Sequence, residues 1–158
     1  MKTIIIGCGA TMENGFGGPV RYDGYEYDES GWYAHALHTH AHCTTVDINP
    51  ACSPSIVLDF ATPDRAELVR KIGHKKFDLI VLETLPDCIY NMAKYFANII
   101  RNCYYISTEI AQVFIPFIND ENAQLLSIYF HFYGYKLIHK SHDFSLIYHI
   151  SNYWWKCL

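Results

Sequence analysis

Glycine and acidic residues stand directly after several short apolar runs of the sequence. Gly7-Cys8-Gly9 follows the first run, Asp47 ends the second, Asp59-Phe60 follows the third and Glu83 the fourth. Two glycines let a ligand approach the backbone closely, and exposed N–H groups there favour an anion. A carboxylate can accept both hydroxyls of a ribose or an exocyclic amine, and a ring can stack on a base. The pattern indicates a nucleotide-like ligand; the alternative is that Asp47 and Asp59 only cap turns.

The apolar runs are typical of buried parallel strands, because they are short and rich in isoleucine, valine and tyrosine. Helical patterns separate them: one over Pro63 to Ile72, with Thr62 as N-cap and Gly73 as C-cap, and one over Asp87 to Arg101. This alternation predicts an α/β fold with a parallel sheet, whose ligands bind at the carboxyl ends of the strands. The expected strands are Thr3 to Ile6, Thr44 to Ile48, Ser55 to Leu58, Phe77 to Leu82 and Cys103 to Ser107.

The last third of the chain has a different rhythm. A helix is predicted over Asn119 to Phe132, followed by strands over Tyr135 to Lys140 and Phe144 to Ser151, joined by a turn at 141–143. Two strands joined by so short a turn must be antiparallel neighbours, because a parallel pair needs a longer crossover. The predicted sheet therefore has seven strands, is mostly parallel, and carries an antiparallel hairpin at its C-terminal end.

Composition excludes several classes of protein. The 158 residues are 51% hydrophobic and 18% charged, with a net charge of -4, which opposes disorder and disfavours a basic nucleic-acid binder. No apolar run approaches the ~18 residues of a membrane span, and the start of the chain lacks the pattern of a secretory signal. Six scattered cysteines without C-x-x-C spacing predict free thiols in a reducing compartment. We expect one cytoplasmic domain, residues 1–158, without nucleic-acid or membrane partners.

An insertion at about 11–31 interrupts the alternation of strands and helices. It holds five glycines, five acids and several tyrosines, which is typical of a lid, a binding loop or a solvated insertion. Directly after it, His35, His38 and His42 would share one face of a helix, with His40 nearby. We favour a helix with partly exposed histidines over a zinc site or a pH-sensitive contact, and predict no metal.

The aromatic residues of the last third are expected to lie mostly in the core. Trp154-Trp155, close to the end of the sequence, is costly to expose, so it should dock on the domain itself. Docking on a second subunit, which would make a homodimer, is the alternative.

With these motifs, the sequence resembles the class I S-adenosylmethionine (SAM)-dependent methyltransferases over nearly its whole length. The resemblance implies a Rossmann-like three-layer αβα sandwich whose reversed last strand corresponds to the hairpin after Gly134. It implies S-adenosylmethionine as cofactor and a small molecule or protein as methyl acceptor, placed near Glu83, Thr84 and the insertion. The cofactor-binding residues that it implies are Gly7, Cys8, Gly9, Asp47, Ile48, Asp59, Phe60 and Glu83. It names no catalytic base.

Departures from the family pattern support two alternatives. Ile5 stands where many members carry an acid, Thr11 replaces a third glycine, and Glu83-Thr84-Leu85-Pro86 replaces the signature of amino-directed DNA methylation. These favour a non-catalytic domain that binds the cofactor or a partner protein. A nucleotide- or NAD-binding oxidoreductase is less favoured, because the third fingerprint glycine is missing here too.

Overall fold

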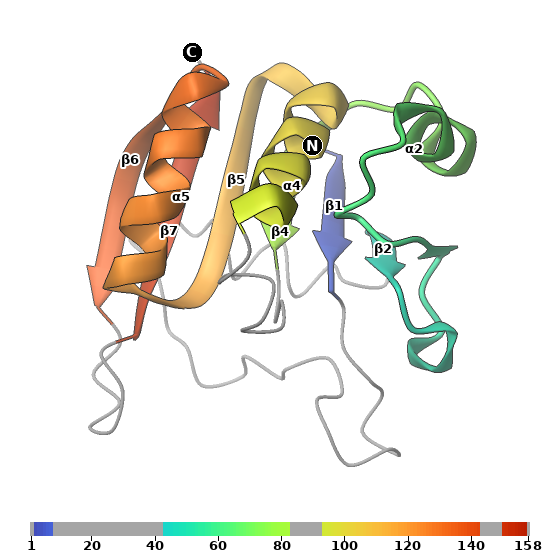
Figure 1. Cartoon of the computed structure of the whole chain (residues 1–158), viewed down its shortest axis with the longest axis horizontal. Helices are drawn as coiled ribbons and strands as arrows, with labels where there is room; N and C mark the ends of the chain where they lie inside the picture. The colour runs from blue at the N-terminus through green and yellow to red at the C-terminus, as the bar shows by residue number, and fades with distance from the viewer. Residues whose placement is uncertain (1, 8–42, 83–92, 143–149, 158) are drawn as a thin grey trace.

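The computed structural model of the chain describes residues 2–7, 43–82, 93–142 and 150–157 (Figure 1). These residues form one seven-stranded sheet with helices packed on it. In chain order the elements are β1 (Thr3–Ile6), β2 (Thr44–Asp47), η3 (Pro50–Cys52), β3 (Ile56–Val57), α2 (Arg65–Ile72), β4 (Phe77–Leu82), α4 (Ala93–Ile106), β5 (Ser107–Asn119), α5 (Asp120–Phe132), β6 (Tyr135–His142) and β7 (Ile150–Cys157).

The strand order is β3-β2-β1-β4-β5-β7-β6. Strands β1 to β5 pair in parallel, and β7 is inserted antiparallel between β5 and β6. The chain reverses its direction of progress along the sheet between β3 and β4, which is the switch point where ligands of such sheets bind. The mostly parallel seven-stranded sheet with a C-terminal antiparallel hairpin is confirmed.

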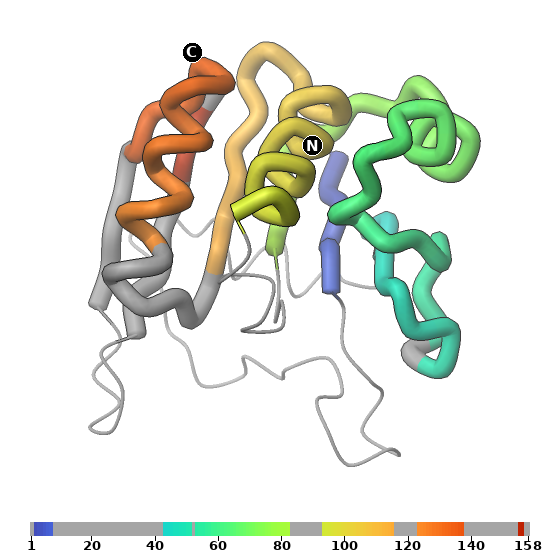
Figure 2. The backbone as a smooth tube through the Cα atoms, in the orientation of Figure 1, coloured from blue at the N-terminus to red at the C-terminus, as the bar shows by residue number. Residues whose placement is uncertain are grey.

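The central strands are buried on both faces, which explains their continuous apolar sequences. On one face, alternate residues such as Ile6, Ile80 and Val113 join a core cluster with residues of α2, α4 and α5. Helices α4 and α5 lie side by side over this face (Figures 1 and 2). On the other face, Ile5 and Val81 are register partners and both are fully buried. Burial on both faces is what a sheet between two covering layers requires.

The expected strand at 103–107 is wrong, because Cys103 and Ile106 belong to the last turns of α4. A short apolar run fits a buried helix as well as a buried strand. Here Cys103 and Ile106 continue the three- and four-residue spacing of the buried residues that begins at Phe96, so they face the same core. Strand β5 begins only at Ser107.

The hairpin also lies further along the chain than expected. Residues 141 and 142 belong to β6 rather than to a turn, and β7 covers 150–157 instead of 144–151. Trp155 is therefore a strand residue between β5 and β6, 1% exposed, and its ring stacks on Phe130 of α5 with centroids 4.5 Å apart. The expectation that this tryptophan pair docks on its own domain is confirmed for Trp155.

Helix α2 begins two residues later than the sequence indicated. Its N-cap is Asp64, whose side chain accepts a hydrogen bond from the backbone N–H of Ala66 at 2.8 Å. Thr62 lies two residues before this N-cap, and its hydroxyl accepts from the Asp64 N–H and donates to Glu67. The C-cap at Gly73 is as expected, with φ at +77°, a conformation that favours glycine. In the described part of the chain, no helix is both long enough and apolar enough to cross a bilayer.

Candidate functional site

The candidate site lies at the carboxyl ends of β1, β2 and β3. The register pairs Ile6 with Val46, and the Gly7 N–H donates to the Val46 carbonyl at 2.8 Å. Gly7 is therefore held beside the end of β2, where Asp47 is the last strand residue. Asp47 in turn pairs with Val57 of β3. Three strand ends thus meet at one edge, as the sequence indicated.

Gly7 occupies a backbone conformation that a side chain would oppose. Its φ is +75°, in the left-handed region, at the point where the chain leaves β1. A glycine here lets the chain turn at once and leaves its backbone open to close approach. This is the local property that an anion-binding turn needs.

Asp47 is held in a fixed orientation by the turn that follows it. Its Oδ1 accepts from the Asn49 N–H at 2.8 Å, and the Asn49 side chain accepts from Ala51 N–H at 3.0 Å to cap η3. The Asp47 carbonyl accepts from the Leu58 N–H at 2.9 Å, which ties β3 to the same turn. The half-buried carboxylate is thereby positioned before any ligand arrives, with the 66% exposed side chain of Ile48 beside it in sequence.

Asp59 and Phe60 differ sharply in exposure. Asp59 is exposed, and its Oδ1 accepts from the Ala61 N–H at 2.9 Å. The Phe60 side chain is only 5% exposed and belongs to the core cluster. Its ring therefore offers no broad face for the base stacking that the sequence suggested. Both acids make the turn-capping bond of the alternative interpretation, and a carboxylate has several lone pairs, so one that accepts a hydrogen bond within its turn can accept another from a ligand.

Two residues that hold the turns after Asp47 and Asp59 were not identified from the sequence. Asn49 orients Asp47 through the bonds described above. Asn102 of α4 is fully buried, and its Nδ2 donates to the carbonyls of Phe60 and Thr62 at 2.9 and 3.0 Å, which anchors the loop after Asp59. Asp-x-Asn-Pro is recognisable turn chemistry and could have identified Asn49. A lone asparagine inside an apolar helix face was the only sign of Asn102.

Several predicted site residues lie outside the described residues, so their placement stays a prediction. They are Cys8, Gly9, Glu83, Thr84, the insertion at 11–31 and the histidines at 35, 38, 40 and 42. Among the residues that the structure describes, no group of three metal-ligating side chains gathers.

Comparisons with known proteins identify the fold. No family model and no curated protein matches the sequence, but many solved structures match the fold. The N-methyltransferase NodS from Bradyrhizobium japonicum is 13% identical with a TM-score of 0.60, over 99% of this chain and 85% of NodS. Magnesium protoporphyrin IX methyltransferase from Synechocystis is 9% identical with a TM-score of 0.59, over 100% of this chain and 70% of that enzyme.

A SAM-dependent methyltransferase from Methanosarcina mazei is 10% identical with a TM-score of 0.61, over 99% of this chain and 92% of its own. The strand order, the antiparallel β7 and these structural matches all indicate the same fold. The chain has the class I methyltransferase fold. Of these neighbours, NodS has also been solved with S-adenosylhomocysteine (SAH) and the Synechocystis enzyme with bound SAM.

Proposed function

We propose that this protein is a SAM-dependent methyltransferase that binds its cofactor at the carboxyl edge of β1, β2 and β3. The observation that carries the proposal is the placement of Asp47, an oriented acid at the end of β2, directly beside the left-handed Gly7 at the end of β1. The fold and the neighbours solved with SAM or SAH support the same cofactor.

The described residues fit the parts of this cofactor. The Asp47 carboxylate is suited to accept the hydroxyls of the ribose, and the turn at Gly7 suits the amino-acid end. The exposed Ile48 side chain offers an apolar surface for the adenine, and the exposed Asp59 can accept from its exocyclic amine. Phe60 then supports the site from the core and through its backbone. Cys8, Gly9 and Glu83 complete the proposed set.

The bound cofactor would supply a methyl group from its sulfonium. Methyl transfer of this kind relies mainly on alignment of the acceptor and exclusion of water. We keep the acceptor as a small molecule or a protein, placed near Glu83 and Thr84. The structural neighbours include an N-methyltransferase, a porphyrin methyltransferase and a ribosomal protein L11 methylase, so the fold itself leaves the acceptor open.

Calorimetric titration of the whole chain with SAM, SAH and NAD tests the cofactor. We expect saturable heat with SAM and SAH, and none with NAD. Heat with NAD alone would favour the oxidoreductase alternative, and no heat with either sulfur compound would contradict the proposal. SAM binding without methyl transfer to any acceptor class would favour the non-catalytic alternative.

A charge-removing substitution tests the site itself. Asp47→Asn keeps an oxygen for the Asn49 N–H but removes the charge that strengthens a hydrogen bond to a ribose hydroxyl. Loss of about 1.5–3 kcal/mol weakens SAH binding roughly 10- to 100-fold. Asp64→Asn is the matched control, because asparagine caps α2 equally well and Asp64 lies outside the site. Equal affinity of the two variants would overturn the assignment of Asp47.

A further inference from the structure

Acidic and basic residues are unevenly distributed along the sequence of this chain. Residues 8–42, 83–92 and 143–149 contain eight of the sixteen acids and only one of the twelve lysines and arginines, Arg21. The described residues therefore hold eleven basic residues against eight acids. The net charge of -4, which argued against nucleic acid at the level of the whole sequence, conceals a basic surface.

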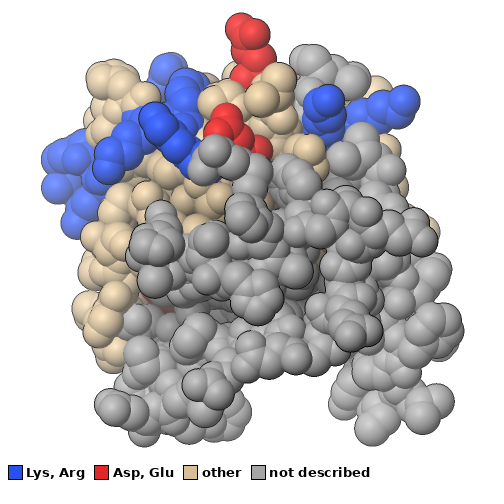
Figure 3. Space-filling model, turned by 180° about the vertical axis from the view of Figure 1, so that it is seen from behind, with Lys and Arg blue, Asp and Glu red and all other residues tan. Residues whose placement is uncertain are grey.

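The basic residues gather at the amino edge of the sheet, opposite the candidate cofactor site. Figure 3 shows lysine and arginine side chains toward both sides of the upper part of the molecule, with some acidic side chains between them, at the edge where β1 and β4 begin. We call this set the basic rim, and all its members are exposed. They are Lys2, Arg65, Arg70, Lys71, Lys75, Lys76, Lys136 and Lys156.

Acidic side chains at this edge are mostly engaged in structural bonds. Asp64 caps α2, Glu67 accepts from Thr62 and lies 4.0 Å from Arg70, and Asp78 accepts from Lys2 N–H and from Thr108. Glu109 is the exposed acid nearest to the start of β5. Among the residues that the structure describes, the basic side chains at this edge therefore outnumber the acidic ones.

Two lysines of the basic rim face each other across a strand pair and destabilise the sheet. Lys136 of β6 and Lys156 of β7 are directly opposite each other, and both are exposed. Like charges across a strand pair are destabilising, and a polyanion would relieve the repulsion. Their place at the amino edge adds a second group of basic side chains, on the last strands, to the group around α2.

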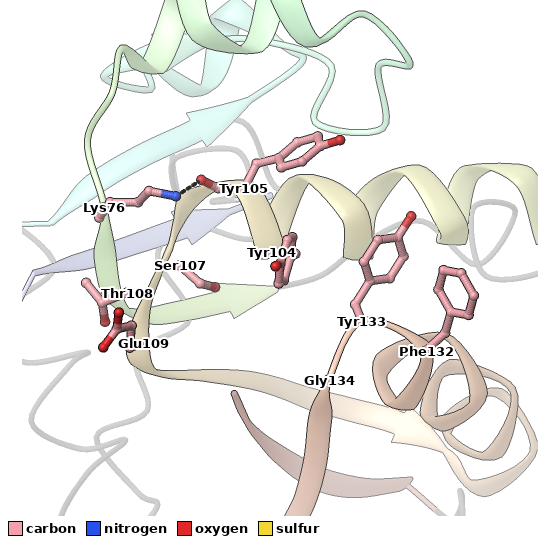
Figure 4. Close-up of a pocket in the computed structure, with 9 residues that line it drawn as sticks. All are labelled: Lys76, Tyr104, Tyr105, Ser107, Thr108, Glu109, Phe132, Tyr133 and Gly134. Carbon is pink, nitrogen blue, oxygen red and sulfur yellow. Dashed lines mark hydrogen bonds between the residues drawn. The ribbon is translucent and has the colours of Figure 1, made fainter. Parts of the chain in front are cut away.

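An aromatic cavity opens at the same edge (Figure 4). It has a volume of about 600 Å³ and lies between the end of α4, the start of β5 and the end of α5. Tyr104 and Tyr133 contact each other at 5.8 Å between centroids, and Phe132 packs edge-on against Tyr133 at 5.2 Å. Phe132 is 80% exposed and Tyr104 is 45% exposed. Lys76, Tyr105 and Glu109 also line the cavity.

The basic rim and the aromatic cavity are joined by direct contacts. The Arg65 guanidinium lies over the Tyr105 ring at 4.4 Å from its centroid. The Lys76 ammonium donates to the Tyr105 carbonyl, as Figure 4 shows, and so caps the end of α4 inside the cavity wall. Cationic groups and exposed ring faces thus belong to one continuous surface.

We propose that this amino-edge surface binds single-stranded nucleic acid. Bases would stack on Phe132, Tyr104 and Tyr133, and phosphates would run along the basic rim. Single-strand binding combines these two features, a positive surface that follows the backbone and aromatic faces for the bases. The proposal is independent of the cofactor, because the surface lies at the opposite edge of the sheet from Gly7 and Asp47.

Other anionic partners fit this surface less well. An acidic peptide would meet the charges but would leave the exposed rings without flat partners. An anionic membrane would bring lipid headgroups against the Glu109 carboxylate, whereas a base can donate an amine to it. Both remain outcomes of the test below.

The test is fluorescence anisotropy with labelled 12-nucleotide oligo-U and oligo-A, as RNA and as DNA, on the whole chain. We expect binding at 50 mM salt that weakens about 20-fold at 200 mM if three phosphates are neutralised. The double variant Phe132→Ala with Tyr104→Ala should weaken binding by about tenfold or more. Lys75→Gln and Lys136→Gln should each lower the salt dependence without changing the fold.

Matched controls separate the surface from general effects. Ile128→Ala removes an exposed apolar side chain one turn earlier on α5 and outside the cavity, and Lys94→Gln removes an exposed lysine at the start of α4. Both should bind like the wild type, with thermal melts verifying that every variant folds. Calorimetry with SAH should be unchanged in the Phe132 and Tyr104 double variant.

Four outcomes would overturn the proposal. They are the absence of binding to any oligonucleotide at 50 mM salt, binding indifferent to the loss of Phe132 and Tyr104, equal or tighter binding of polyglutamate or of phosphatidylserine vesicles, and full competition by UMP or AMP at the affinity of the oligonucleotide. The last would indicate a mononucleotide pocket instead of a docking surface.

Discussion

Asp78 joins three strands at the amino edge, and its removal should destabilise the protein in a pH-dependent way. Its Oδ2 accepts from the Lys2 N–H at 2.8 Å and its Oδ1 accepts from the Thr108 hydroxyl at 3.0 Å, which links β4 to the starts of β1 and β5. The Lys2 N–H, partly opposed by desolvation and assisted by Thr108, lowers the pKa of the Asp78 carboxyl below its usual 3.8.

The size of the effect follows from these two bonds. Hydrogen bonds to a charged group contribute about 1.5–3 kcal/mol when buried. Because Asp78 is only half-buried, solvent screening reduces this, and we expect Asp78→Ala to cost about 1–2 kcal/mol at pH 7. For a chain of this length that corresponds to a fall in Tm of roughly 2–8 °C.

The sign of the pH dependence is determined by the lowered pKa. A carboxyl whose pKa is lower in the folded state stabilises the protein above its unfolded pKa, and this stability is lost as the pH falls through the folded value. The free energy of unfolding of the wild type should therefore exceed that of Asp78→Ala by a constant amount from pH 5 to 8. This difference should shrink below about pH 4. Urea unfolding monitored by circular dichroism measures it. An unchanged margin at pH 2.5, or none at pH 7, would refute the reasoning.

Three further predictions concern the core and its thiols. Trp155→Ala should cost about 3–5 kcal/mol, because it removes a fully buried ring stacked on Phe130; urea unfolding that showed less than 1 kcal/mol would contradict this packing. Asn102→Ala should cost about 2 kcal/mol, since it removes the donor to the Phe60 carbonyl and leaves the Thr62 carbonyl with the longer bond from Arg101 at 3.4 Å, and hydrogen exchange in residues 59–62 should rise. Burial raises the pKa of the Cys103 thiol, so it should react with a maleimide far more slowly than the half-buried Cys43 until the protein is denatured; mass spectrometry of the labelled peptides measures both rates, and equal rates would contradict the burial.

The strands that the sequence predicted most accurately are β1 and β4, whose bounds match the expectation. Both are buried on both faces, so all their residues are apolar except Thr3 and Asp78 near the two strand starts, and a polar or glycine residue follows each run. The end of α4 could not be assigned in this way. Its last turn is as apolar as a strand, and the core that decides between the two is built from residues far away in the sequence.

The candidate site was predictable in its positions and only partly in its side chains. Asp47 and Gly7 lie side by side because their positions at strand ends are determined by the parallel register, which the pattern of runs implied. The exposure of Phe60 was not predictable. The burial of this ring goes together with a hydrogen bond from Asn102, more than forty residues later, to the Phe60 carbonyl. This bond holds the loop against α4, and the Phe60 ring belongs to the core.

The basic rim was not predictable from the composition of the sequence. Net charge is a sum over the sequence, whereas binding depends on where the charges lie. Most of the described acids at the amino edge accept hydrogen bonds within the fold. Asp64 caps α2, and Asp78 links neighbouring strands. No composition argument distinguishes an acid that caps a helix from one that faces solvent.

The structure of the chain crystallised with saturating SAH tests the central claim most directly. We expect the ribose hydroxyls within about 3 Å of the Asp47 carboxylate, the adenine against Ile48 and the amino-acid end at the turn that begins with Gly7. SAH bound at another place, or no bound SAH at saturating concentration, would contradict it.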